Sequence, residues 1–130
     1  MTGNEYQKLA MRTNDGKSNH RLYKKVLESR DNINPICSDM GGLIMGCLGL
    51  AGESGEFTDM IKKWVFHEKE LDIGHAAKEL GDILWYVAMI CESFGWELED
   101  VMKINIMKLR ARYPEGFNVE QANNRKAGDD

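Results

Sequence analysis

The stretch GLAGESGEFTDMIKK, residues 49–63, lies in a segment that otherwise has the composition of a helix. It contains three glycines, and each costs about 1 kcal/mol relative to alanine inside a helix. It also places Glu53 and Glu56 three positions apart in an apolar stretch, so that they project side by side from a helix. Neither feature stabilises a helix, so both need another explanation.

The rest of the chain predicts an all-α protein. Only two prolines occur, helix-forming residues dominate, and no stretch alternates for long with the period of a strand. Helices are expected over roughly residues 3–12, 19–31, 39–67, 73–94 and 98–112. Ser38 or Asp39 is expected to cap the third of these helices, and Asp72 to cap the fourth, which ends at Gly95.

Length and composition predict one helical domain, residues 1–117, followed by a polar, flexible tail at residues 118–130. The chain has 130 residues, of which 42% are hydrophobic and 29% charged, as in ordinary soluble domains. Its net charge of −4 provides no basic footprint, which argues against a nucleic-acid partner.

The same sequence argues against a membrane protein and for a cytoplasmic one. The N-terminus has no apolar signal region, and the longest apolar stretch is shorter than the ~20 residues that span a bilayer. The three cysteines are odd in number and form no Cys-x-x-Cys motif, so we interpret them as reduced thiols. Cys47 and Cys91 are expected to fill the core.

Glu53 falls on the apolar side of its predicted helix. At about 100° per residue, one arc carries Leu43, Leu50, Phe57, Ile61 and Trp64. Glu53 lies inside this arc and Glu56 lies at its edge. An enclosed carboxylate needs a cation, a hydrogen-bond donor or a proton.

The helix predicted over residues 73–94 is apolar around most of its circumference, which is typical of a helix buried on most sides. One narrow arc is polar and carries His75, Glu79, Asp82 and Tyr86. We expect the histidine to be structural or exposed. Glu79 and Asp82 are three apart and therefore form a second pair of adjacent carboxylates.

The two acid pairs predict a site for a divalent cation. A connector of about six residues allows the two long helices to lie antiparallel, so that the pairs face each other. Four facing carboxylates repel one another unless a cation lies between them, and all-oxygen ligation suits Mg²⁺, with Mn²⁺ as a substitute. Neither pair contains the histidine of the Glu-x-x-His motif, which argues against a di-iron site.

The helix predicted over residues 98–112 adds a polar stripe of Asn105, Lys108 and Arg112. Cations beside a carboxylate-held metal suit a polyphosphate, because together they stabilise the charge of a leaving pyrophosphate. The glycines at positions 49, 52 and 55 lie near the face of Glu56, where the absence of side chains would admit a neighbouring helix or a ligand.

Three motifs resemble those of the MazG-like members of the all-α nucleoside triphosphate pyrophosphohydrolases. They are GLAGESGEFTDMIKK, KELGDILWYVAMI and NIMKLRARYPEGF, and with EYQKLAMRT near the N-terminus they cover roughly residues 5–117. The order of Glu-x-x-Glu, Lys-Lys, Glu-x-x-Asp and Asn-x-x-Lys-Leu-x-x-Arg-Tyr-Pro is specific. The resemblance implies a helical bundle with two long antiparallel core helices.

The resemblance also implies an activity and a set of site residues. The reaction would be Mg²⁺-dependent hydrolysis of a (deoxy)nucleoside triphosphate between the α- and β-phosphates, giving a monophosphate and pyrophosphate. The implied catalytic and metal-binding residues are Glu53, Glu56, Glu79 and Asp82, with Glu53 and Glu56 as the two candidates for the general base. The implied substrate-binding residues are Lys63, Tyr86, Asn105, Lys108, Arg112 and Tyr113. Relatives of this kind assemble as dimers or tetramers.

Two other readings stay open at the level of sequence. One is a non-catalytic helical module for nucleotide sensing or oligomerisation, although all four acids and the basic stripe are intact. The other is a related enzyme of the same superfamily, such as a phosphoribosyl-ATP pyrophosphatase. The base preference and the choice between homodimer and homotetramer are not predicted.

Overall fold

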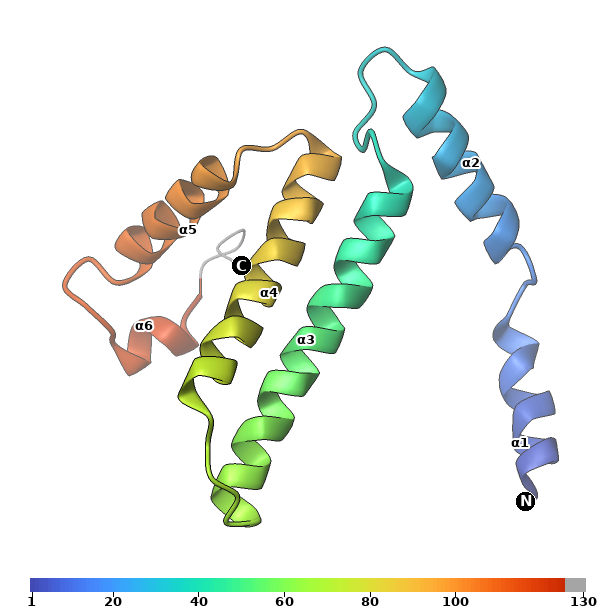
Figure 1. Cartoon of the computed structure of the whole chain (residues 1–130). Helices are drawn as coiled ribbons and strands as arrows, with labels where there is room; N and C mark the ends of the chain where they lie inside the picture. Colours follow the sequence, from blue (N-terminus) through green and yellow to red (C-terminus); the bar gives the residue numbers. More distant parts are fainter. Residues whose placement is uncertain (126–130) are drawn as a thin grey trace.

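The computed structural model describes residues 1–125 and is built from helices (Figure 1). They are α1 (Gly3–Ala10), the short 3-10 helix η1 (Met11–Thr13), α2 (Ser18–Asp31), α3 (Met40–Phe66), α4 (Ile73–Phe94), α5 (Leu98–Arg112) and α6 (Val119–Asn123). No strand occurs among these described residues, which confirms the all-α prediction. The bounds predicted for α4 and α5 are confirmed, and those of the earlier helices differ by one or two residues.

The two long helices begin and end where their capping residues predict. The Asp39 carboxylate accepts a hydrogen bond from the Gly42 amide at 2.8 Å at the start of α3, so Asp39 rather than Ser38 is the cap. Asp72 accepts from the His75 amide at 2.9 Å at the start of α4. Gly95 ends α4 with φ of 69°, a left-handed conformation that glycine adopts without steric cost.

α3 and α4 pack against each other as an antiparallel hairpin, and glycines on α3 allow the close approach (Figure 1). A Cβ atom added at Gly46 would lie 2.7 Å from Cγ1 of Ile90, and one added at Gly49 would overlap the ring of Tyr86. Close approach therefore explains Gly49, as the sequence predicts. An added Cβ atom at Gly52 would meet nothing within 4 Å, so close approach of the helices does not explain this glycine.

The end of the hairpin opposite the connector is closed by hydrogen bonds. The Ser38 amide donates to the Ser93 carbonyl at 2.8 Å, and the Ser38 hydroxyl lies 3.3 Å from the same oxygen. Ser93 is 2% exposed, and Cys37 and Cys91 are also buried. The small core of the chain therefore includes the place where the segment entering α3 meets the end of α4.

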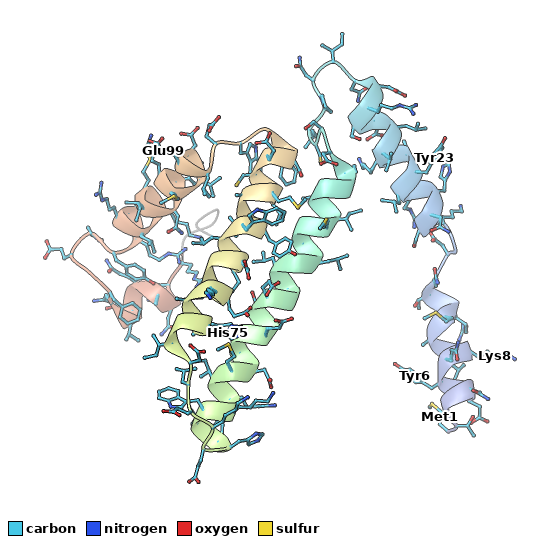
Figure 2. All side chains as sticks on the ribbon, viewed as in Figure 1. Met1, Tyr6, Lys8, Tyr23, His75 and Glu99 are labelled. Atoms are coloured by element: carbon cyan, nitrogen blue, oxygen red, sulfur yellow. The ribbon has the colours of Figure 1, made fainter. Side chains whose placement is uncertain are left out.

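The remaining helices do not cover the hairpin. Figure 1 shows α1 and α2 as a separate arm, whereas α5 lies on the side of α4 away from α3. Tyr6 and Tyr23 on this arm project into open space (Figure 2). The prediction that α4 is buried on most sides is wrong for the single chain, because Leu84 is 61% and Trp85 is 56% exposed.

Two further expectations need correction. Cys47 is exposed rather than part of the core. The tail contains α6, begun by Asn118, whose side chain accepts from the Gln121 amide at 3.1 Å. Residues 126–130 lie outside the described part of the chain, so a flexible tail stays a prediction. Within residues 1–125, the helices lack the combination of length and hydrophobicity that a membrane-spanning helix needs.

Candidate metal centre

Three of the four predicted acids meet between the two long helices. Glu53 and Glu56 come from α3, and Glu79 comes from the facing turn of α4. One carboxylate oxygen from each lies within 4.8 Å of the other two. This distance suits three ligands of one divalent cation, because Ca²⁺ and Mg²⁺ bind oxygens at about 2.0–2.6 Å.

Glu79 is the most enclosed of these acids. Its side chain is 9% exposed, and its Oε1 atom lies 3.1 Å from Nε2 of His75, one turn earlier on the same helix. Its Oε2 atom is buried and has no hydrogen-bond partner within the described structure. A buried carboxylate oxygen without a partner is costly, and a bound cation would satisfy it.

The proximity of the acids changes the protonation of Glu53. Its carboxyl group is within hydrogen-bonding reach of Glu79, and this contact is the main cause of its raised pKa. Partial burial and the negative charges of Glu56, Glu79 and Asp82 raise the pKa further. Without a cation the cluster therefore favours a proton on Glu53, as expected for like charges held together.

Asp82 lies at the margin of this cluster. It is exposed and does not belong to the group of three oxygens within 4.8 Å. Its charge nevertheless contributes to the raised pKa of Glu53. Its predicted role as a fourth ligand stays a prediction.

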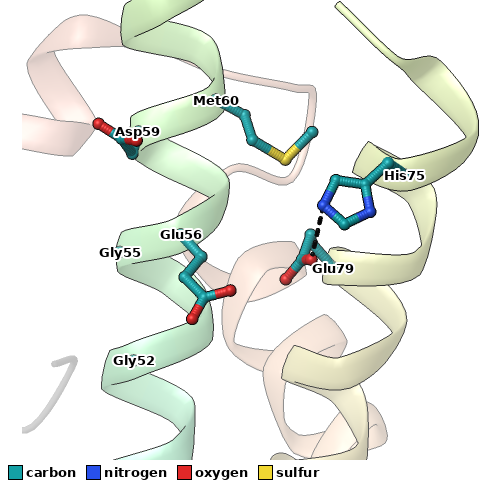
Figure 3. A pocket seen from close by; sticks show the side chains of 7 residues that line it. All are labelled: Gly52, Gly55, Glu56, Asp59, Met60, His75 and Glu79. Carbon is teal, nitrogen blue, oxygen red and sulfur yellow. Dashed lines mark ion pairs between the residues drawn. The ribbon is translucent and has the colours of Figure 1, made fainter.

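A pocket of about 400 Å³ opens beside the acids (Figure 3). It is lined by Gly52, Gly55, Glu56, Asp59, Met60, His75 and Glu79. Figure 3 shows Glu56 and Glu79 projecting toward each other across it. An added Cβ atom at Gly52 or Gly55 would meet nothing within 4 Å, so these glycines keep the wall on the α3 side low. The donor set and the open space both fit a hard divalent cation with a ligand.

The predicted substrate-binding residues are not gathered at this pocket. Lys63 lies one turn beyond Asp59, and its ammonium group is 2.5 Å from the Asp59 carboxylate. Hydrogen bonds from Lys63 and then Lys62 lower the pKa of Asp59 to about 2. Tyr86 is half-buried, lies over Gly49, and contacts the Trp85 ring edge-on at 5.0 Å between centroids.

The α5 residues of the predicted stripe lie elsewhere in the single chain. None of the residues that line the pocket comes from α5. The guanidinium carbon of Arg112 lies 6.0 Å from the centroid of the Tyr113 ring, and that ring is 5.5 Å from the ring of Phe117. Asn105 is exposed and Lys108 is half-buried. Contact of these residues with a nucleotide stays a prediction.

Two pocket residues were not predicted as part of the site. His75 was expected to be structural or exposed, and its side chain is 55% exposed, but it also contacts a cluster acid and lines the pocket. Its position four residues before Glu79, on the same polar arc, was the available signal. Asp59 also lines the pocket, and its spacing of three residues from Glu56 places both on one side of α3.

Over more than half of its length the chain is similar to known proteins. The family model for the MazG nucleotide pyrophosphohydrolase domain matches residues 46–117, which include all three clustered acids and α5. The Gene 37 protein of Mycobacterium phage L5 is 32% identical over 94 residues, covering 68% of this chain and 82% of the phage protein. No solved structure matches the chain. The chain belongs to the MazG nucleotide pyrophosphohydrolase family.

Proposed function

We propose that the protein is a Mg²⁺-dependent nucleoside triphosphate pyrophosphohydrolase, with Mn²⁺ as a substitute metal. It would cleave a ribo- or deoxyribonucleoside triphosphate between the α- and β-phosphates and release a monophosphate and pyrophosphate. Such an activity would serve housekeeping of the nucleotide pool in the cytoplasm. Membership of the MazG family supports the class of reaction.

The observation that carries the proposal is the cluster of Glu53, Glu56 and Glu79. Three carboxylate oxygens within 4.8 Å, one residue of the three almost fully buried, are unfavourable unless a cation or proton lies between them. The partnerless Oε2 atom of Glu79 supports a cation, because a cation needs oxygens that other groups have not taken.

The acids of the cluster would divide the chemical work. When bound, the metal would polarise the phosphate oxygens and offset their charge. Glu53, Glu56 and Glu79 would hold it, and Asp82, at the margin of the cluster, would complete the ligand set. Glu53 or Glu56 would take the proton of the attacking water, since both lie in the cluster and a general base must lie within hydrogen-bonding reach of that water.

The basic residues would bind the phosphates. Lys63, Lys108 and Arg112 would share the triphosphate charge, and charge-assisted hydrogen bonds from such groups are the strong ones. Asn105 and Tyr113 would contribute neutral hydrogen bonds beside them. Tyr86, whose ring lies over Gly49, would flank the sugar or the base.

A complete site of this kind would need an assembly. The pocket of one chain is lined only by residues of α3 and α4, and the chain exposes large apolar side chains on α4 and α5. Burial of apolar surface drives association, so a homodimer or homotetramer would cover these side chains. A neighbouring subunit could then bring its α5 to the acids.

The test is a substrate panel. The purified protein is incubated with each nucleoside and deoxynucleoside triphosphate, and with phosphoribosyl-ATP, in Mg²⁺ or Mn²⁺, and the products are identified by ³¹P NMR. At least one nucleoside triphosphate should give equal amounts of monophosphate and pyrophosphate. Glu79→Gln should lower the rate about 100-fold or more, as loss of a transition-state stabiliser does. The matched control Glu92→Gln changes an exposed acid on the same helix and should keep the activity.

Three results would count against the proposal. Binding of triphosphates without turnover would indicate a sensing module. Cleavage of phosphoribosyl-ATP alone would indicate the related enzyme. Release of orthophosphate rather than pyrophosphate would indicate a different bond.

A further inference from the structure

His75 occupies a fixed position at the start of α4. Its backbone amide donates to the capping carboxylate of Asp72 at 2.9 Å, which holds the first turn of the helix in place. Glu79 follows four residues later, so the two side chains lie on one face of α4. The imidazole therefore starts from an ordered backbone and reaches Glu79 along the helix.

The contact uses one oxygen of Glu79 and leaves the other. Nε2 of His75 lies 3.1 Å from Oε1, within hydrogen-bonding distance, and Figure 3 marks this contact. The Oε2 atom is buried, and residues 1–125 provide no hydrogen-bond partner for it. Since the side chain of Glu79 is 9% exposed, water has little access to either oxygen.

His75 is the only donor among the residues that line the pocket. The other six are two glycines, one methionine and three acids, none of which has a side chain that donates hydrogen bonds when the acids are ionised. The nearby Lys62 and Lys63 lie outside the lining and pair with Asp59 at 3.0 and 2.5 Å. Among the residues that line the pocket, His75 is therefore the one whose side chain can donate a hydrogen bond to the ionised Glu79 carboxylate.

We propose that His75 is a positioning residue, which donates its Nε2–H to Oε1 of Glu79 and so keeps Oε2 available to a divalent cation. The imidazole acts through the carboxylate and does not bind the cation itself. This inference rests on the metal site of the proposed function. Hydrogen-bonding partners of metal ligands fix the orientation of those ligands, and their loss typically lowers metal affinity about 10- to 100-fold.

The experiment measures Mn²⁺ binding to the metal-free full chain by electron paramagnetic resonance, without nucleotide. All variants are compared at the same pH and ionic strength. His75→Ala should weaken Mn²⁺ binding about 10-fold or more. His75→Gln, which keeps an N–H donor of similar reach, should restore most of the affinity. His67→Ala is the matched control, because His67 is exposed and lies outside the pocket.

The outcomes separate this inference from the proposed function. Absence of Mn²⁺ binding by the unaltered chain would overturn both. If the unaltered chain binds Mn²⁺ and His75→Ala binds it equally well, only the positioning role fails. Nitrogen coupling from His75 in the pulsed spectrum of bound Mn²⁺ would show direct ligation and overturn the positioning role. An equal loss of affinity in His75→Gln and His75→Ala would overturn it as well. The thermal midpoint of each metal-free variant, expected to equal that of the unaltered chain, shows that the fold is kept.

Discussion

The α3–α4 hairpin and the helices around it differ in how their apolar side chains are used. In the hairpin, Gly46 and Gly49 let α4 approach α3, and the acids face inward between the two helices. On the outer side of α4, Leu84 and Trp85 stay more than half exposed, and on α5 Ile104 is 65% exposed. The facing sides of the hairpin thus pack against each other, whereas these outer apolar side chains are left exposed by the described residues. The difference teaches that the acid cluster and the proposed phosphate-binding stripe need not belong to the same subunit.

The largest expected effect tests whether α5 works with the hairpin. Lys108→Ala should lower kcat/KM about 10- to 100-fold, because a charge-assisted hydrogen bond contributes roughly 1.5–3 kcal/mol. Lys103→Ala is the matched control, since its ammonium lies 2.5 Å from Glu99 on the same helix. Steady-state kinetics on the substrate found in the panel gives the values.

Mixing of variants then shows whether the acids and the α5 stripe of one site come from one subunit or from two. Lys108→Ala subunits mixed with Glu79→Gln subunits should regain activity if the stripe of one subunit serves the acids of another. A mixture no more active than the sum of its parts would assign both groups to one chain.

The second prediction concerns the contact that defines the hairpin. Gly46→Ala should lower the free energy of unfolding by about 1–3 kcal/mol, because the added methyl would lie 2.7 Å from Cγ1 of Ile90 and force the helices apart. In Gly81→Ala on α4, the added methyl would meet nothing within 4 Å. This substitution should raise the free energy of unfolding by up to about 1 kcal/mol, because alanine favours a helix more than glycine does. Urea unfolding measures both variants. Equal effects would mean that the helices do not approach closely at Gly46.

The third prediction follows from the raised pKa of Glu53. The folded chain holds this proton more tightly than the unfolded chain, so the contribution is most favourable below the ordinary glutamate pKa of 4.5. Metal-free stability should therefore fall as the pH rises through the raised pKa. Glu53→Gln should remove that fall and be more stable than the unaltered chain at neutral pH without metal.

Thermal unfolding across pH, with and without Mg²⁺, checks the third prediction. Mg²⁺ should stabilise the unaltered chain, by about 2.7 kcal/mol at 100 times its dissociation constant. It should stabilise Glu53→Gln less. A pH-independent difference between the two proteins would mean that Glu53 is not close to the other acids.

The smallest expected effect concerns the ion pairs of Asp59. Its pKa of about 2, lowered from 3.8 by Lys63 and Lys62, means that its contribution to stability is present above pH 3.8 and is lost as the pH falls toward 2. The group is exposed to solvent, so Asp59→Asn should lower the thermal midpoint only slightly, and less at high salt. Glu99→Gln on α5 is the comparison outside the hairpin. A large drop in the thermal midpoint of Asp59→Asn would show that the fold depends on this acid.

The sequence predicts the hairpin well because its signals are local. Asp72 and Gly95 fix the ends of α4 through capping geometry that depends on a few neighbouring residues. The spacing of Glu53, Glu56 and Glu79 predicts their meeting, because helical periodicity and a short connector leave few other arrangements.

The burial of the helix faces, the contact of His75 and the position of the α5 stripe depend on tertiary interactions that helical periodicity does not predict. Burial of α4 and Cys47 was expected from apolar composition, yet burial needs a second element that covers the face, and in the described structure Leu84, Trp85 and Cys47 are exposed. The side-chain contact of His75 depends on a rotamer and on the burial of Glu79, neither of which follows from the polar arc. Whether the α5 stripe reaches the acids depends on how subunits associate, and local sequence patterns do not predict that association.

The hydrogen bonds between Ser38 and Ser93 have a consequence for the acids far along the hairpin. The connector joins α3 to α4 covalently at one end, and these hydrogen bonds hold the opposite end together. Links at both ends therefore oppose separation of the helices when the three carboxylates repel one another. The hairpin holds the acids close together before a cation arrives. A cation would then bind without first having to draw α3 and α4 together.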